Sequence, residues 1–178
     1  MSERANILNC PVDKLSMDET ISLIDKSINE NKPMRHVVVN AAKLVFMKTN
    51  DELYNAVVTC DIINADGQAV VWASKFLGDP LPERTSGIDI MEELIKRSES
   101  KGYKIFFLGA KEEVVSKVVE IYSEKYSPNI IAGYRNGYFK EEESEQIANQ
   151  IAESGAHILL VAISSPMKEL FLEKYRHV

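Results

Sequence analysis

The feature that most constrains how this chain can fold is a set of four short apolar runs. Each run leads into a polar group and then into a helical pattern. The runs are His36–Asn40, Asp61–Ala65, Lys104–Leu108 and His157–Ile163. Apolar runs without alternation are typical of strands buried on both faces. Strands of this kind that alternate with helices predict a parallel sheet, here a Rossmann-like α/β sandwich with helices on both faces. We expect one domain over residues 1–178.

The segments between these strands carry recognisable helix signals. Ser16 and Glu19 form a capping box at the start of an amphipathic helix that ends near Pro33. Later patterns predict helices over residues 41–48, 51–58, 68–77, 88–100, 111–125 and 141–154, and a last helix that opens at Ser164-Ser165-Pro166. A first strand is expected over Ala5–Cys10, followed by a turn at Pro11, and another short strand over residues 129–132.

Composition excludes several classes of protein. The chain has 178 residues and a formal net charge of −6, which argues against nucleic-acid binding through bulk electrostatics. Its two cysteines are too few for a disulfide framework and have no metal-ligand spacing. The sequence contains no run of signal-peptide type and no stretch that could span a bilayer, so a cytoplasmic protein is expected. The last helical pattern stops near Tyr175 without a cap, which predicts a longer parent protein.

Polar groups follow four of the predicted strands. They are Asn40, Asp66-Gly67-Gln68, Gly109-Ala110 and Ser164-Ser165-Pro166. Because the carboxyl ends of parallel strands meet at one edge of a sheet, and ligands of open α/β folds bind there, we expect these groups to line one cleft. The loops that hold Arg84 and Tyr134–Tyr138 should rise from the same edge.

The side chains at this edge each allow two interpretations. Asp66 is either a helix cap or a general base for a substrate hydroxyl. Arg84 is either a solvated charge or a bidentate clamp on phosphate. Tyr138 either packs over a flat ring or covers the sheet edge. His36 and His157 precede strands, which favours solvated positions over catalysis.

Two of the turns have similar alternatives. Gly109-Ala110 is either a tight strand-to-helix turn or a place where phosphate meets free helix N–H groups. Ser164 to Pro166 has the pattern of a serine N-cap followed by proline at the first helical position. Its interpretation as an anion site depends only on its place at the sheet edge.

Several of these motifs together resemble a known family. They are Asn64-Ala65-Asp66-Gly67, the block from Leu81 to Asp89 that reads LPERTSGID, Phe107–Ala110, Gly137-Tyr138-Phe139 and Ser165-Pro166. In this order they resemble WecG/TagA/CpsF-type glycosyltransferases, and the chain from about Ala5 onward is most similar to the TagA branch. The resemblance implies an inverting, metal-independent transfer without a cofactor. N-acetylmannosamine would pass from UDP-N-acetylmannosamine to N-acetylglucosamine on undecaprenyl diphosphate, in wall teichoic acid linkage-unit synthesis.

The resemblance also implies roles for individual residues. Asp66 matches the catalytic base. The positions that match acceptor, diphosphate or UDP contacts are Asn40, Gln68, Arg84, Gly109, Ala110, Arg135, Gly137, Tyr138, Ser164, Ser165 and Glu169. The chain departs from the family pattern at Val38, where threonine is frequent, and at Lys168, where glutamine is usual.

The family continues past the match to Val178 into a basic segment that meets the membrane. The resemblance therefore implies a peripheral protein at the inner face of the cell membrane, and self-association where that segment is missing. Three other functions stay open: a related hexosaminyl donor, a nucleotide-binding module without catalysis, and an NAD-type oxidoreductase. The last is weakened by the lack of a G-x-G-x-x-G motif.

Overall fold

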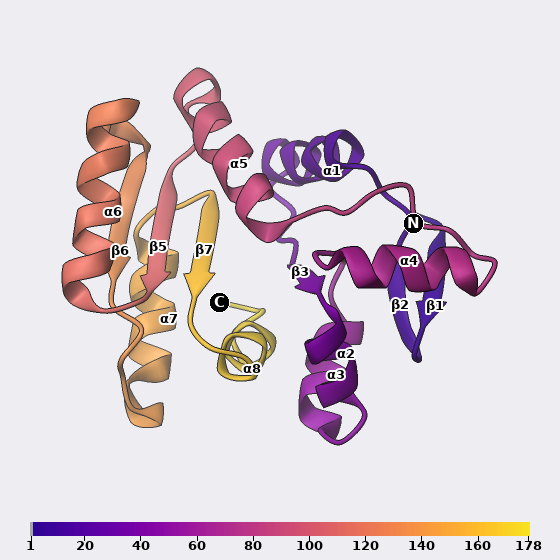
Figure 1. The fold of residues 1–178 in the computed structure, drawn as a ribbon. Helices are drawn as coiled ribbons and strands as arrows, with labels where there is room; N and C mark the ends of the chain where they lie inside the picture. Colours follow the sequence, from indigo (N-terminus) through magenta and orange to yellow (C-terminus); the bar gives the residue numbers. More distant parts are fainter. Residues whose placement is uncertain (1) are drawn as a thin grey trace. The chain divides into compact units, whose positions relative to one another are not determined.

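The computed structural model describes residues 2–178, which form an α/β fold with parallel strands (Figure 1). Its contacts divide the chain into two compact units, the first ending at Ile90 and the second running from Met91 to Val178. Helix α5, Gly87–Lys101, contains the point of division. A single domain over residues 1–178 stays a prediction.

The first unit contains a hairpin, a parallel strand pair and four helices before α5. Its strands are β1 (Arg4–Ile7), β2 (Cys10–Asp13), β3 (His36–Val39) and β4 (Ile62–Ala65). The helices are α1 (Met17–Asn29), α2 (Ala41–Met47), α3 (Asp51–Val58) and α4 (Gln68–Phe76). Strands β3 and β4 run parallel, from His36 opposite Ile62 to Val39 opposite Ala65. The predicted capping box of Ser16 and Glu19 is present at the start of α1.

The first strand prediction was wrong, because residues 4–13 form an antiparallel hairpin instead. Leu8 and Asn9 have φ values of 53° and 69°, so both central residues are left-handed, as in type I′ hairpin turns. Leucine rarely adopts this conformation, and the sequence therefore carried little signal for the turn. Pro11, expected as the turn, lies inside β2 opposite Asn6.

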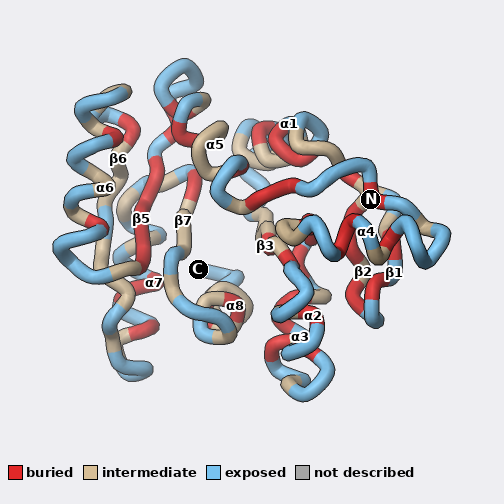
Figure 2. Tube along the Cα trace, in the orientation of Figure 1, coloured by how far each residue is buried: buried red, intermediate tan, exposed pale blue. Residues whose placement is uncertain are grey.

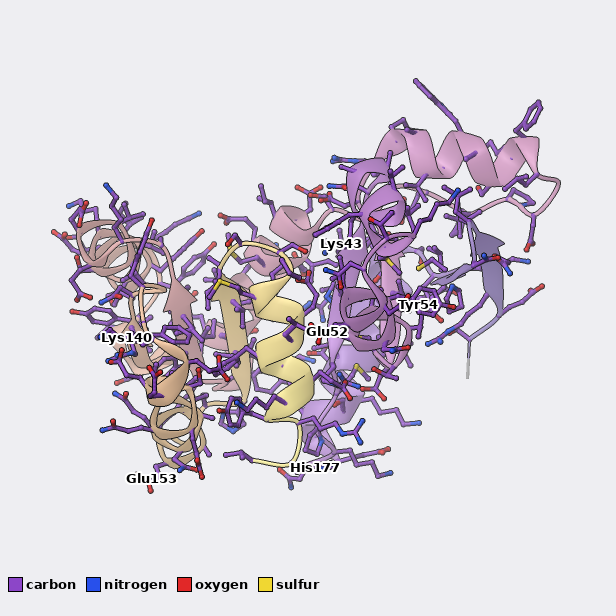
Figure 3. All side chains as sticks on the ribbon, turned by 90° about the horizontal axis from the view of Figure 1, so that it is seen from below. Lys43, Glu52, Tyr54, Lys140, Glu153 and His177 are labelled. Atoms are coloured by element: carbon purple, nitrogen blue, oxygen red, sulfur yellow. The ribbon has the colours of Figure 1, made fainter. Side chains whose placement is uncertain are left out.

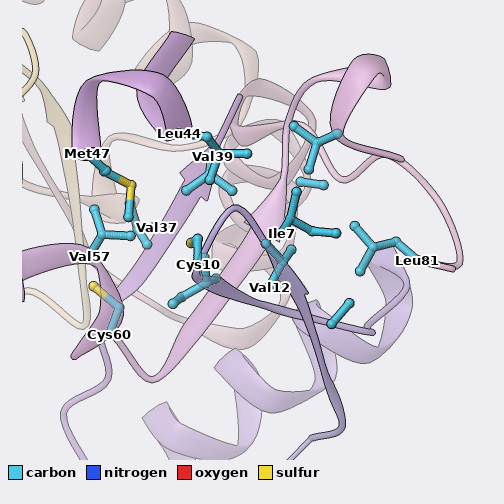
Figure 4. Packing of buried hydrophobic residues seen from close by; sticks show 14 of the residues in the cluster. Ile7, Cys10, Val12, Val37, Val39, Leu44, Met47, Val57, Cys60 and Leu81 are labelled. Carbon is cyan, nitrogen blue, oxygen red and sulfur yellow. The ribbon is translucent and has the colours of Figure 1, made fainter. Parts of the chain in front are cut away.

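The hairpin and the strand pair share one hydrophobic core (Figure 4). The buried strand residues in it are Ala5, Ile7, Cys10, Val12, Val37, Val39, Ile63 and Ala65. Since successive strand residues point to opposite faces, the other face of the pair carries His36, Val38 and Asn64. Packing on one face therefore fixes which polar side chains the other face presents.

The second unit is built on a three-stranded parallel sheet with the order β6-β5-β7. The strands are β5 (Ile105–Gly109), β6 (Ile131–Arg135) and β7 (Ile158–Ala162). The helical elements are α6 (Glu112–Lys125), η1 (Pro128–Ile130), η2 (Glu141–Glu143), α7 (Ser144–Glu153) and α8 (Met167–Lys174). The predicted helix over residues 141–154 thus begins with a 3-10 turn, and the predicted strand over residues 129–132 begins later, at Ile131.

Helices cover both faces of this sheet. On one face the rings of Phe107 and Tyr122 of α6 stack 6.1 Å apart. On the other face Phe106 and Leu108 belong to a core that includes Ile147 of α7 and Phe171 of α8. Figure 2 shows β5 buried along its length while the flanking α6 and α7 expose their outer sides. The prediction of a parallel sheet with helices on both faces is confirmed for this unit.

Candidate active site

Asp66 lies where β4 ends, at the carboxyl edge of the β3–β4 pair. Its backbone N–H donates to the Val39 carbonyl oxygen at 2.9 Å, which ties it to the end of β3. Gly67, not Asp66, is the N-cap of α4, and no side chain caps that helix end. Within residues 2–178 the Asp66 carboxylate has no hydrogen-bond or ion-pair partner. The interpretation of Asp66 as a helix cap is therefore wrong, and its half-buried carboxylate is free to meet a ligand.

Asn40 lies beside this carboxylate. A Cβ added to Gly67 would lie 3.3 Å from the Asn40 Cβ, so the two strand ends are in contact. Asn40 is the N-cap of α2, and its Oδ1 accepts the Lys43 backbone N–H at 2.9 Å. Its amide Nδ2 has no partner among the described residues. Asn40 can therefore donate to a hydroxyl or an amide of a bound molecule while it caps α2.

The loop before α5 closes on the same strand end. The Thr85 N–H donates to the Ala65 carbonyl oxygen at 2.8 Å. The Thr85 hydroxyl is buried and has no hydrogen-bond partner in the part of the chain that the structure describes. Buried hydroxyls almost always have a partner, so this one suits a ligand. Sequence reasoning did not single out Thr85, although it stands inside the LPERTSGID block.

Arg84 and Gln68 are more exposed members of this group. The Arg84 Nη2 lies 3.3 Å from the Asp89 Oδ2, and its side chain is 44% exposed. An ion pair so open to solvent contributes little to stability, and the guanidinium can exchange Asp89 for a ligand anion. Gln68 is exposed in the first turn of α4.

Val38, a position where the resemblance implied threonine, lies on β3 two residues before Asn40. Its methyl group faces the first residue of α5, since a Cβ on Gly87 would lie 3.3 Å from the Val38 Cγ2. The contact is apolar on both sides. Val38 thus presents no hydroxyl, and it packs where β3 and the start of α5 meet.

A buried polar network around Asn64 lies two residues before Asp66, on the same face of the strand. The Asn64 Nδ2 donates to the Thr20 Oγ1 at 3.2 Å, and the Asn64 Oδ1 lies 3.0 Å from the His36 Nε2. Both Thr20 and Asn64 are buried. The prediction that His36 is a solvated strand start was wrong, because its ring is half-buried and bonded to Asn64, which Thr20 of α1 contacts.

This network gives the chain a pH-dependent stability. Burial lowers the pKa of His36 to about 4, from an ordinary value near 6.5. Between these two values the unfolded chain binds a proton at His36 and the folded chain does not, so stability falls as the pH falls through this window. We expect the His36 contribution to drop by about 2 kcal/mol between pH 7 and pH 5.

Urea titrations of the parent chain and of His36→Gln at the two pH values check this prediction. The difference in unfolding free energy between the two chains should shrink by that amount at pH 5, because carboxylates elsewhere titrate equally in both. If the unfolding free energies of the two chains change in parallel with pH, the pH dependence does not come from His36.

In the second unit the ends of β5, β6 and β7 come together. Gly109 and Ala110 have φ values of 138° and 56°, and the Ala110 N–H donates to the Ala162 carbonyl oxygen at 3.1 Å. The Gly137 N–H donates to the Ala110 carbonyl oxygen at 2.9 Å. A Cβ on Gly137 would lie 2.9 Å from the Gly109 Cα. Glycine is required here because three backbones approach one another more closely than side chains allow.

Charged and aromatic residues surround this glycine cluster. Arg135, at the end of β6, donates from Nη2 to the Glu143 Oε1 at 3.1 Å, and its Nε is buried without a partner in residues 2–178. The Tyr138 side chain is 72% exposed. It therefore covers little of the sheet edge and is available to stack on a flat ring. The first turn of α6 carries Glu112 and Glu113, and Glu112 accepts from the Asn136 Nδ2 at 2.9 Å.

The segment after β7 differs from its prediction. Pro166, not a serine, is the N-cap of α8, and no side chain caps the helix. The peptide bond between Ser165 and Pro166 is cis. Pro166 is thus outside the helix instead of at its first position, so the serine N-cap prediction was wrong. Ser164 and Ser165 are exposed at this end of the sheet, and Glu169 is buried in the first turn of α8.

The strand ends therefore form two groups, one in each unit. The expectation that all of them line one cleft spans both units and stays a prediction. Among residues 2–178 no three His, Cys, Asp or Glu side chains lie together as metal ligands. No helix in that range is long and apolar enough to cross a membrane.

Comparisons with known proteins agree with the motifs. A family model described as "Glycosyl transferase WecG/TagA/CpsF family" matches residues 5–178. A relative from Bacillus spizizenii is 33% identical over 152 residues, which is 85% of this chain and 58% of that protein. A second, from Bacillus subtilis (strain 168), is 30% identical over 174 residues, 97% of this chain and 67% of that protein. Both are named N-acetylglucosaminyldiphosphoundecaprenol N-acetyl-beta-D-mannosaminyltransferase.

Proposed function

The chain belongs to the glycosyl transferase WecG/TagA/CpsF family, and on that premise we propose that it is an N-acetylmannosaminyltransferase. The donor is UDP-N-acetylmannosamine, and the acceptor is N-acetylglucosamine on undecaprenyl diphosphate, as in the names of the relatives. The observation that carries the proposal is the unpartnered Asp66 carboxylate at the carboxyl edge of β4.

In the proposed reaction Asp66 is the general base. Its carboxylate takes the proton of the acceptor hydroxyl, and the hydroxyl oxygen forms a bond to the anomeric carbon of the donor. The bond between that carbon and the UDP oxygen breaks on the opposite face, and UDP leaves with the electron pair. The anomeric configuration is therefore inverted.

Neighbours of Asp66 are assigned to the acceptor. The free amide of Asn40 and the unpartnered hydroxyl of Thr85 can donate to sugar oxygens, and Arg84 can meet the diphosphate. These three residues and Asp66 all belong to the first unit. Gln68, in the first turn of α4, is assigned to the same group.

The strand ends of the second unit are assigned to the donor nucleotide. The carboxylates of Glu112 and Glu113 repel an anion such as phosphate at the start of α6. Ribose hydroxyls and the uracil N–H can instead donate hydrogen bonds to these carboxylates. Tyr138 is exposed enough to stack on the base. We therefore place the nucleoside at Gly109-Ala110, with Arg135 and the segment from Ser164 to Glu169 nearer the diphosphate.

We place the reaction at the cytoplasmic face of the cell membrane, since the proposed acceptor is a lipid, and in the synthesis of wall teichoic acid linkage units. The chain spans 58% and 67% of its two relatives, and contact with the membrane is assigned to the family's C-terminal segment. The sugar transfer itself uses no cofactor. A related hexosaminyl donor would use the same chemistry.

Isothermal titration calorimetry with UDP, UMP and NAD tests the nucleotide class. We expect UDP to bind and NAD not to bind, because the turn at Gly109 lacks the glycine pattern of dinucleotide sites. Binding of NAD alone would replace the transferase with an oxidoreductase. Turnover of the lipid acceptor is then measured in a form of the protein that carries the family's C-terminal segment. If this form binds UDP but does not turn over the acceptor, the protein is a nucleotide-binding module without catalysis.

A further inference from the structure

The loop between α4 and α5 is tied to the rest of the first unit at every second residue. It covers residues 78–86 and runs from the end of α4, past the start of α1, to the start of α5 (Figure 1). Figure 3 shows the same loop from below, where it leaves the outer end of α4 and turns back. The tied residues are Asp79, Leu81, Glu83 and Thr85, and they alternate with the exposed residues Pro80, Pro82 and Arg84.

The first two ties fix the start of the loop. The Asp79 N–H donates to the Ser74 carbonyl oxygen at 3.0 Å, and the Asp79 carboxylate pairs with Lys14. The Leu81 N–H donates to the Ser74 Oγ at 2.9 Å, and the Leu81 side chain is buried in the core that the hairpin shares with β3 and β4. The two prolines of the loop restrict its backbone further, because their rings fix φ.

Glu83 ties the middle of the loop to α1. Its Oε1 accepts the Met17 backbone N–H at 2.6 Å. Met17 is the first residue of α1, and the first N–H groups of a helix have no partner within the helix. A carboxylate at this position also meets the positive end of the helix dipole. Within residues 2–178 the Glu83 side chain has no other hydrogen-bond or ion-pair partner, so it serves this contact alone.

Glu83 and Thr85 stand on either side of Arg84, which the proposed function assigns to the diphosphate. The Thr85 N–H donates to the Ala65 carbonyl oxygen at 2.8 Å, at the end of β4. Among the described residues the Arg84 side chain is bonded only to Asp89, and that ion pair is exposed. The backbone position from which the guanidinium reaches a ligand is therefore set by its two neighbours in the chain.

We propose that Glu83 is a positioning residue for Arg84: its bond to α1 holds the guanidinium where it meets the diphosphate of the acceptor. The inference rests on the proposed function, because it takes Arg84 as the diphosphate contact. An arginine that binds phosphate through two parallel hydrogen bonds depends on its exact placement, and it loses them when the backbone beneath it moves. Glu83 is itself an anion that repels a diphosphate, so it acts through Arg84 and not by touching the ligand.

Glu19 offers a matched control at the same end of α1. Its Oε2 accepts the Ser16 backbone N–H at 2.8 Å, in the capping box that starts the helix. Glu83→Ala and Glu19→Ala each remove a carboxylate from this helix end, and both should lower the urea midpoint of unfolding. Only Glu83→Ala also releases the loop. A merely structural role of Glu83 therefore predicts the same effect of both variants on ligand binding.

Isothermal titration calorimetry with inorganic pyrophosphate, under conditions where every variant is folded, tests the proposal without turnover. We expect Glu83→Ala to weaken pyrophosphate binding about tenfold, and Glu19→Ala to leave it unchanged. The loss of a negative charge alone would strengthen the binding of an anion, so the expected change has the opposite sign to that effect. Glu83→Gln should bind at least as tightly as the parent chain, because its amide oxygen can still accept the Met17 N–H.

A double-mutant cycle shows whether Glu83 acts through Arg84. In a chain that already carries Arg84→Ala, the further change Glu83→Ala should leave pyrophosphate binding as it is, since there is no guanidinium to misplace. A loss of the same size in both backgrounds would overturn the proposal.

Steady-state kinetics with the lipid acceptor give a second readout, in a form of the protein that carries the family's C-terminal segment. We expect Glu83→Ala to raise KM for the acceptor about tenfold and to keep kcat within about twofold, because the diphosphate contact is the same before and during the reaction. If that form turns over no acceptor while pyrophosphate binding still depends on Glu83 through Arg84, the proposed transferase fails and the positioning role stands.

The remaining outcomes each decide against the proposal. Unchanged or tighter pyrophosphate binding by Glu83→Ala would show that Arg84 needs no support from α1. An equal loss in Glu19→Ala would reduce Glu83 to a part of the helix cap, and an equal loss in Glu83→Gln would show that the charge matters instead of the bond to Met17. A parent chain that binds no pyrophosphate would remove Arg84 as a diphosphate contact, and the positioning role with it.

Discussion

The variant Asp66→Asn should lose transfer activity by about 10²- to 10⁴-fold in kcat, the usual contribution of a general base. Asparagine keeps the shape of the side chain but cannot accept the hydroxyl proton. Because the Asp66 carboxylate has no partner within residues 2–178, the substitution breaks no contact of the folded chain. We therefore expect the free energy of unfolding to change by less than about 0.5 kcal/mol. Transfer to the lipid acceptor is measured in an active form of the protein, together with urea unfolding.

Asp61→Asn is the matched control, because Asp61 precedes the same strand at its other end. Its Oδ2 accepts the Arg35 backbone N–H at 2.8 Å, a role that asparagine can keep. This variant should retain both activity and stability. Near-normal turnover of Asp66→Asn would remove it from the mechanism.

The sequence was most informative where local patterns and tertiary packing agree. The runs His36–Asn40 and Asp61–Ala65 are continuous and apolar, and they form the paired strands β3 and β4 with boundaries within one residue. The Ser16 cap and the Asn50 cap are both satisfied locally, by residues three positions on, and the Ser16 cap was predicted. These signals depend on neighbours in sequence, so they survive in any tertiary context.

The sequence was least informative where distant contacts decide the backbone. Leu8 adopts a left-handed conformation although its residue type disfavours it, because the hairpin joins the core of β3 and β4. His36 is half-buried because its ring meets the buried Asn64, which is bonded to Thr20 of α1, and nothing in its immediate neighbours indicates that contact. At Pro166 the chain enters α8 from a cis peptide bond instead of from a serine cap.

The candidate site shows the same division. That Asp66 follows a buried strand could be predicted from the pattern, and so could the polar groups of the other strand ends. That the α4 cap is Gly67, and that the Thr85 hydroxyl is buried without a partner, depends on how the Pro-rich loop returns to Ala65. The structure was therefore needed to decide between a helix cap and a general base at Asp66. The position of Asp66 at the edge of the sheet could be predicted from the sequence.

The variant Gly109→Ala should be the most destabilising single change at the strand ends of the second unit. The Gly109 φ of 138° lies in a region that alanine avoids, and an added Cβ would lie 2.4 Å from the carbonyl carbon and oxygen of Ala162. Both clashing atoms are backbone, so β7 itself would have to move. Strain and overpacking together should cost about 3–5 kcal/mol, a large share of the stability of a domain. Urea unfolding measures the loss.

Gly102→Ala isolates the contribution of backbone strain, since Gly102 has a φ of 71° and no atom within 4 Å of the added Cβ. It should cost only about 1 kcal/mol. The difference between the two variants then reports the contact of Gly109 with Ala162. Because this contact holds the ends of β5 and β7 together, Gly109→Ala should also weaken UDP binding at concentrations of urea where the variant is still folded. If the two variants are equally stable, β7 can shift at little energetic cost to accommodate the added Cβ. The glycine cluster would then not hold a nucleotide site rigidly.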